Sequence, residues 1–367
     1  SLNTIVGDSA GAALTSGANN TAVGQASLAA NTTAVSNTAV GRNAMLVNTT
    51  GDNNVAVGAY ALDANTTGAN NVAIGLSSLG ANTTADDNTA VGVSALLVNT
   101  TGAENVAVGA YALTANTTAG ENTAIGQNSL LSNTTGSANT SVGKSSLASS
   151  TTGANNTAVG KGALGANTTA DNNTAVGITA LGANTTGTEN VAFGQVALTA
   201  NTTGDYNTAL GRAALYNNTT ADNNTAVGWN SLLANTTGDG NTAVGGVSLD
   251  ANTTAANQTA VGYDSLGSAT TGGGNTALGR QSGSAVTTGT FNTLIGYAAG
   301  DTITTGGNNI VIGYVSDVSA SGAASQFVLG NGVISAGDGN FTFGDGTTDS
   351  NIANGATTIT APSDIRL

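Results

Sequence analysis

The segment that decides the fold is residues 54–70, NVAVGAYALDANTTGAN, because its pattern recurs along almost the whole chain. We number its residues as positions 1 to 17, which places Gly58 at position 5. A glycine occupies position 5 in 20 successive repeats, from Gly7 to Gly330, without insertion or deletion. Such a strict register is typical of a solenoid, in which each coil stacks on the preceding one. We therefore expect an all-β, parallel β-solenoid (β-roll) of 17-residue coils that runs continuously over residues 1–330.

The composition argues against several classes of protein. A net charge of −14 leaves no basic patch for a phosphate backbone or an anionic membrane, so we expect no nucleic-acid partner. No apolar run approaches the roughly 18 residues of a spanning helix, so we expect no membrane insertion. Cys is absent, which removes disulfides and thiolate metal sites. The apolar residues nevertheless recur at fixed positions, which distinguishes the chain from a disordered one.

Two apolar columns are expected to form the core. Positions 1 to 4 alternate like a short strand, and position 4 is always Val, Ile, Leu or Phe. Position 9 is Leu or Met from Leu28 to Leu266. The core residues expected from these columns include Val23, Leu28, Val57, Leu62, Ile74 and Leu79. Glycine at position 5 permits a turn, and the Asn-Thr-Thr segment at positions 12 to 14 favours a second turn with ladders of Asn and Thr.

Position 3 carries alanine from Ala22 to Ala277, with Ser141 as the one interruption. We expect this position to point outward. One interpretation is a small residue that is merely tolerated on a strand, but so strict a repetition indicates a surface that packs tightly against another copy of the chain. Three copies around an axis form a closed assembly, so we expect a homotrimer. The trimer-packing residues expected on this basis include Ala22, Ala39, Ala56, Ala73, Ala90, Ala107, Ala124, Ala158 and Ala175.

The repeat also resembles known families. The unit Asn-Thr-Ala-Val-Gly at residues 37–41 resembles the head repeat of trimeric autotransporter adhesins. The longer unit that adds Ala-Leu and Asn-Thr-Thr-Gly is similar to repeats of bacteriophage tail fibres. This resemblance covers residues 1 to about 344 and implies a trimeric, left-handed β-roll. Adhesin heads of the best-known type use a shorter repeat, and this chain shows no coiled-coil stalk.

The C-terminal part differs from the rest. The glycine spacing shortens to 14 between Gly330 and Gly344, and larger apolar residues appear, so residues 331–362 are expected to form a cap or transition region. Residues 363–367, SDIRL, resemble the start of the intramolecular chaperone domain that follows many phage fibres and endosialidases. The resemblance implies autocleavage between Pro362 and Ser363, with the rest of that domain outside this chain.

No catalytic, cofactor or metal site is expected, and we do not expect an enzyme. Histidine is absent, which removes the commonest general base and metal ligand. Ten of the 20 acidic residues lie at positions 16 and 17, which is typical of an exposed turn. Pairs such as Asp86 and Asp87 leave acid–base catalysis or calcium binding as alternatives, although no EF-hand-type loop is present.

Position 6 holds five of the six basic residues, and in other repeats it holds aromatic ones. The candidates for receptor contact are Trp229, Tyr263, Tyr297 and Tyr314. The alternative is that these rings pack on neighbouring coils or chains, since Leu76, Val93 and Ile178 occupy the same position.

These observations favour a structural and adhesive fibre, the shaft of a phage tail fibre that mediates or presents attachment to a host surface. Its partners would be copies of itself and a glycan or protein receptor, and its location would be extracellular, on the virion tail. One alternative is the head of a bacterial trimeric adhesin at the cell surface. Another is an ice-binding β-solenoid with regular rows of threonine.

Overall fold

The computed structural model describes residues 2–353, 355 and 356. It divides into two units, Ser1–Thr188 and Glu189–Leu367, which are described here one at a time. Every helix or strand among the described residues is a β-strand, and each unit is a stack of 17-residue coils. The expected all-β parallel β-solenoid is therefore confirmed.

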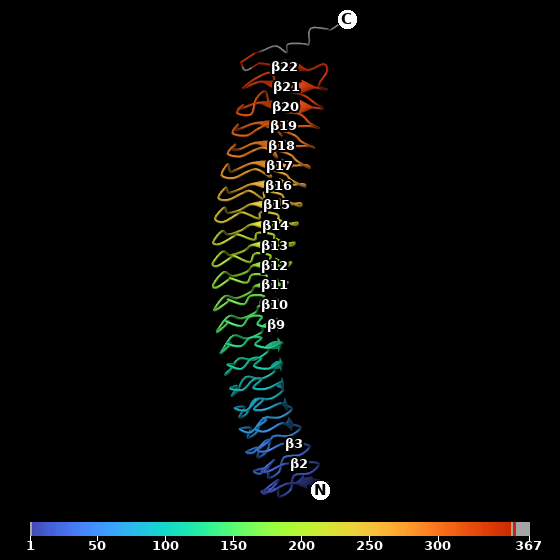
Figure 1. The fold of residues 1–367 in the computed structure, drawn as a ribbon, viewed down its shortest axis with the longest axis vertical. Coiled ribbons are helices and arrows are strands. Elements are labelled where there is room, and N and C mark those ends of the chain that lie inside the picture. The colour runs from blue at the N-terminus through green and yellow to red at the C-terminus, as the bar shows by residue number, and fades with distance from the viewer. Residues whose placement is uncertain (1, 354, 357–367) are drawn as a thin grey trace. The chain divides into compact units, whose positions relative to one another are not determined.

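Unit 1 contributes one three-residue strand from each repeat, and each strand pairs in parallel with the strand of the next repeat (Figure 1). The pairing joins equivalent positions, as in Thr21 with Thr38. The strands are β1 (Thr4–Val6), β2 (Thr21–Val23), β3 (Thr38–Val40), β4 (Val55–Val57), β5 (Val72–Ile74), β6 (Thr89–Val91), β7 (Val106–Val108), β8 (Thr123–Ile125), β9 (Thr140–Val142), β10 (Thr157–Val159) and β11 (Thr174–Val176).

Unit 2 continues the same scheme up to β21, and β22 then pairs antiparallel with β21. The pairing of β20 with β21 spans 14 residues, because Phe327 lies beside Phe341. The strands are β12 (Val191–Phe193), β13 (Thr208–Leu210), β14 (Thr225–Val227), β15 (Thr242–Val244), β16 (Thr259–Val261), β17 (Thr276–Leu278), β18 (Thr293–Ile295), β19 (Ile310–Ile312), β20 (Phe327–Gly330), β21 (Phe341–Gly344) and β22 (Ser350–Ile352).

The orientation of the strands is opposite to the one expected. The position-3 alanines are fully buried inside the coil of their own chain, and the side chains at positions 2 and 4 face outward. Position 3 instead faces position 8 across the coil, because the hydroxyls of Ser141 and Ser146 lie 2.6 Å apart. The expected trimer-packing surface is therefore wrong for every residue named for it. Those residues are Ala22, Ala39, Ala56, Ala73, Ala90, Ala107, Ala124, Ala158 and Ala175.

The expected core is half correct. The position-9 residues Leu28, Leu62 and Leu79 are fully buried, as expected. The position-4 residues are not buried: Val23 is half-buried, and Val57 and Ile74 are exposed. The physical reason is space, because Leu at position 9 already fills the thin coil and leaves room only for alanine opposite it.

Buried asparagines replace part of the apolar core. At position 1, the side chain of Asn37 donates to the carbonyl of Gly51 in the same coil and accepts from the backbone N–H of Asn54 in the next. At position 12, Nδ2 of Asn65 donates to Oδ1 of Asn48 in the preceding coil, at 2.8 Å. The position-13 threonine hydroxyls donate to the backbone carbonyl oxygen of the position-13 residue in the next coil, at 2.8–3.3 Å. The expected ladders of Asn and Thr are confirmed.

The C-terminal coils of unit 2 change the shape of this core. Position 3 becomes larger at Leu294, and position 9 becomes glycine at Gly283 and Gly300. A Cβ atom on either glycine would lie about 2.5 Å from a Leu294 methyl group, so the large and small residues have exchanged sides. Pro362 and Ser363, at the expected cleavage junction, lie outside the described residues.

Candidate interaction surfaces

The first candidate surface is the outward side of the strands, which we call the sheet face and define by positions 2 and 4 of each unit. Position 4 is apolar in every strand from β1 to β20, and position 2 is threonine, valine or a larger apolar residue. Ile74 is 39% exposed and Phe193 is 53% exposed. A continuous row of exposed apolar side chains is typical of a protein interface.

In unit 2 the sheet face ends in a cluster of phenylalanines. The Phe327 and Phe341 rings meet edge to face at 4.6 Å, and Phe341 stacks on Phe343 at 5.1 Å. Phe327 and Phe341 line an apolar hollow of about 280 Å³. The cluster adds large apolar area to the same face that the position-4 row already makes apolar.

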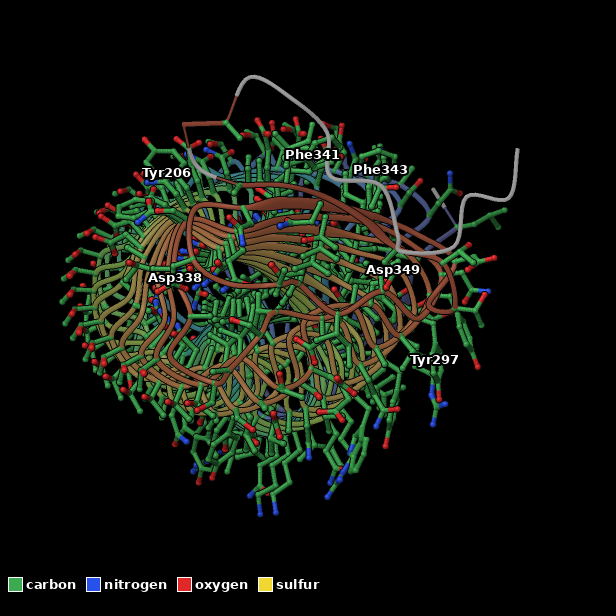
Figure 2. All side chains as sticks on the ribbon, turned by 90° about the horizontal axis from the view of Figure 1, so that it is seen from above. Tyr206, Tyr297, Asp338, Phe341, Phe343 and Asp349 are labelled. Carbon is green, nitrogen blue, oxygen red and sulfur yellow. The ribbon has the colours of Figure 1, made fainter. Side chains whose placement is uncertain are left out.

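The second candidate surface lies beyond the position-5 glycine. We call it the aromatic ridge and define it as position 6 of seven successive coils of unit 2: Arg212, Trp229, Gly246, Tyr263, Arg280, Tyr297 and Tyr314. Figure 2 shows Tyr297 pointing outward from the coil, away from the side that carries Phe341 and Phe343. The aromatic ridge is therefore separate from the sheet face of unit 2.

The rings of the ridge contact each other and remain exposed. Tyr297 stacks on Tyr314 with centroids 5.3 Å apart. The Arg280 guanidinium carbon lies 5.8 Å from the centroid of Tyr263 and 5.6 Å from that of Tyr297. Trp229 is 50% exposed and Tyr314 is 59% exposed. Packing on neighbouring coils therefore applies to Tyr263, Tyr297 and Tyr314. Receptor contact stays a prediction.

The acidic residues at position 16 have a structural role. A carboxylate oxygen of Asp52 accepts the backbone N–H of Val35 in the preceding coil at 2.7 Å, and Asp86 does the same for Ala69. Asp87, at position 17, accepts from the side chain of Asn70. These bonds give Asp86 and Asp87 partners along the stack. Among the described residues, no group of three acidic, His or Cys side chains is placed to hold a metal ion.

One carboxyl group is buried within unit 2. Asp317 takes position 9, where other coils have leucine, and its side chain accepts the backbone N–H groups of Thr302 and Val318. Burial, together with a hydrogen bond shared with the Asp301 carboxyl group, raises its pKa to about 6. The Asp345 carboxylate is the opposite case, because bonds from Thr347 and Thr348 lower its pKa.

Comparison with models of known protein families gives no match, and comparison with curated proteins gives none either. No helix among the described residues is long and apolar enough to cross a membrane. The sequence interpretation identified the aromatic ridge but missed the sheet face. The variation of position 2 between Thr and Val, and of position 4 among residues of different size, would have indicated outward positions.

Proposed function

We propose that the chain is a structural and adhesive fibre segment that associates with copies of itself, as expected for a phage tail fibre shaft. The observation that carries this proposal is the sheet face, where each coil leaves an apolar position-4 side chain in water. Burial of such a side chain against a second copy contributes on the order of 1 kcal/mol. Repeated in every coil, this contribution makes association strongly favourable.

Three copies around a common axis bring each sheet face against its neighbours and leave no apolar edge open. The homotrimer is thus retained as a proposal, with the sheet face in place of the alanine column. The position-6 side chains would remain available on the outside for a receptor at an extracellular surface, on a virion tail in this proposal.

Light scattering combined with sedimentation velocity tests this proposal on the whole chain. We expect a mass of three times the 35.0-kDa chain. Ile74→Asp together with Ile125→Asp should dissociate the assembly, because both residues are exposed on the sheet face of unit 1. Leu76→Asp is the matched control, since Leu76 is also exposed but lies at position 6. A monomeric wild type, or dissociation by the control alone, would rule out the proposed interface.

Two other functions share this geometry. A bacterial trimeric adhesin head would use the same sheet face and differ in its gene context, which would encode a secretion signal and a membrane anchor. An ice-binding solenoid is favoured by the regular outward threonines at position 2, as in β2 and β3. Thermal hysteresis of a monomeric chain would support ice binding and argue against the fibre.

A further inference from the structure

The aromatic ridge concentrates two residue types that are scarce in this chain. The chain has one tryptophan and seven tyrosines, and the ridge holds the tryptophan and three of the tyrosines. It also holds Arg212 and Arg280, the basic residues of unit 2 among those that the structure describes. The coil does not require large rings here, because Gly246 occupies the same position.

We propose that the aromatic ridge binds an acidic polysaccharide, with sugar rings against the aromatic side chains and sugar carboxylates against Arg280 and Arg212. This inference rests on the proposed adhesive function and names the chemical class of its receptor. It assigns the receptor contact to unit 2, where the ridge lies.

The Arg280 guanidinium is pre-organised to bind an anion. It lies between the Tyr263 and Tyr297 rings, and its Nη1 donates to the Tyr297 hydroxyl at 3.3 Å. The two rings restrict the guanidinium, so less conformational entropy is lost when it binds a carboxylate. Within the part of the chain that the structure describes, no salt bridge joins Arg280 to a carboxylate. Its remaining N–H groups are therefore available for a bidentate bond.

The shape of the ridge favours a linear sugar polymer over a protein. The ridge is one residue wide and repeats once per coil, with a rise of roughly 4.8 Å set by strand pairing. A specific protein partner needs an interface of about 1,000 Å² or more with a buried centre, which a single row of side chains does not offer. An extended polysaccharide can instead contact successive coils through one residue each.

Trp229 supplies a ring that no other described ring contacts. It stands two coils from Tyr263, with Gly246 between them. A Cβ atom on Gly246 would lie 3.5 Å from the Tyr263 ring, so that ring already covers the glycine. No ring contact to Trp229 is found among the described residues, and half of its surface is exposed. Its free face is available for a sugar ring.

The carboxylates near the ridge set a limit on binding. Asp264 follows Tyr263 in sequence and accepts a bond from Gln281 at 3.4 Å. Asp250 and Asp301 lie four positions further along their coils than the ridge residues Gly246 and Tyr297. Asp264 is the acidic group nearest in sequence to the ridge, so its charge should oppose an acidic ligand. Removing that charge should therefore strengthen binding, and this outcome distinguishes an acidic from a neutral sugar.

The single tryptophan makes the test direct, because intrinsic fluorescence of the whole chain reports on the ridge. The probes are size-defined oligosaccharides of alginate and hyaluronan, with dextran as the neutral polymer. We expect both acidic probes to change Trp229 emission in a saturable, salt-sensitive manner and dextran to leave it unchanged. Equal binding of dextran, or no binding of either acidic probe, would overturn the proposal.

Binding of the same probes to variants of the chain is measured by calorimetric titration, which does not depend on tryptophan fluorescence. Arg280→Gln and Tyr263→Ala should each weaken binding about tenfold, and Asp264→Asn should strengthen it. Lys144→Gln is the matched control, because Lys144 occupies position 6 in unit 1. Equal losses for Lys144→Gln and Arg280→Gln would show non-specific charge attraction and overturn the site. Light scattering on the same samples reports separately on the fibre proposal, which can stand if the ridge fails.

Discussion

The position-5 glycines show how one residue fixes the repeat. Gly262 adopts a φ of +137°, and a Cβ atom there would lie 2.4 Å from the carbonyl oxygen of Gly279 in the next coil. An alanine meets both a forbidden backbone conformation and a backbone atom that cannot move alone. The regular glycine is thus a condition for stacking coils at strand spacing.

Gly262→Ala should accordingly lower the free energy of unfolding by about 3 kcal/mol or more. Gly246→Ala is the control, since its φ is not positive and its nearest new contact is a 3.5 Å approach to Tyr263. The control should change stability by less than about 1 kcal/mol. Urea unfolding followed by fluorescence compares the two, and equal losses would contradict the role given to position 5.

Ser150 breaks the position-12 asparagine ladder. Oδ1 of Asn133 and Oγ of Ser150 are buried without a hydrogen-bond partner, because serine is too short to reach the preceding coil. Asparagine donates to that oxygen elsewhere, as Asn133 does to Asn116 at 2.9 Å. Ser150→Asn should therefore stabilise unit 1 by about 1 kcal/mol.

The reverse substitution, Asn99→Ser, is the control for Ser150→Asn. It should destabilise unit 1 by about 1 to 3 kcal/mol, since it leaves Oδ1 of Asn82 without its donor. Thermal unfolding by circular dichroism measures both changes. A rise in stability for Asn99→Ser would refute the ladder as a source of stability.

At the scale of the element, the sequence predicted the strands and turns and failed on their orientation. The period of 17, a short strand within positions 1 to 4 and the turns at Gly and Asn-Thr-Thr all follow from local conformational preference. A strand of three residues has only one side chain on one face and two on the other, so alternation alone does not identify the buried face. The deciding quantity is the width of the coil interior, which is a tertiary property.

Leu294 and Gly283 allow the width of the coil interior to be tested, because a large residue stands at position 3 and a small one at position 9. Leu294→Ala alone should lower stability by about 2 to 5 kcal/mol by opening a cavity. Gly283→Leu alone should also destabilise, since its Cβ atom would lie 2.5 Å from a Leu294 methyl group. The backbone at Gly283, with φ of +60°, resembles that of Leu266, with φ of +51°, so leucine fits it.

The double variant restores the usual pairing of alanine at position 3 with leucine at position 9. It should be more stable than the sum of the single losses predicts, by at least about 1 kcal/mol. A double-mutant cycle from urea unfolding measures this coupling. Strictly additive losses would show that the two side chains do not share one space.

Asp317 makes the stability of the C-terminal coils of unit 2 depend on pH. Its pKa is raised from 3.8 to about 6 in the folded state, so the folded state binds more protons than the unfolded chain between these values. Stability should therefore fall as pH rises from 4 to 6.5, by on the order of 2 kcal/mol. Burial raises the pKa of Asp250 as well and acts in the same direction.

Trp229 fluorescence during urea unfolding follows unit 2 at each pH. Asp317→Asn should flatten most of the slope between pH 4 and 6.5, with Asp250→Asn as a comparison of smaller effect. The lowered pKa values of Asp338 and Asp345 act in the opposite direction and below this range. A rise in stability with pH in the wild type would contradict the assignment to Asp317.

At the scale of the whole molecule, each coil of unit 1 contacts its neighbours through the same bonds, so whole coils should be removable. Deletion of residues 88–104, one repeat from position 1 to position 17, joins Asp87 to Asn105 in the correct register. Strand β5 then pairs with β7. The backbone N–H of Asn105 donates to Oδ1 of Asn71, as the backbone N–H of Asn88 does now. The chain should keep its circular dichroism per residue and lose only the stability of one coil.

Deletion of residues 88–95 is the matched control, because it leaves a coil of 9 residues that cannot return to the strand position. Its backbone groups lose their partners on both sides, and each buried unpaired group costs about 1 to 3 kcal/mol. Limited proteolysis should cut this variant near the junction and leave the 17-residue deletion intact, since only the latter preserves the period. If both deletions were equally resistant, the coils would be independent of register, and the strict period of the sequence would need another cause. If both were cleaved, unit 1 would depend on particular side chains in this coil, and the nearest-neighbour account of its stability would fail.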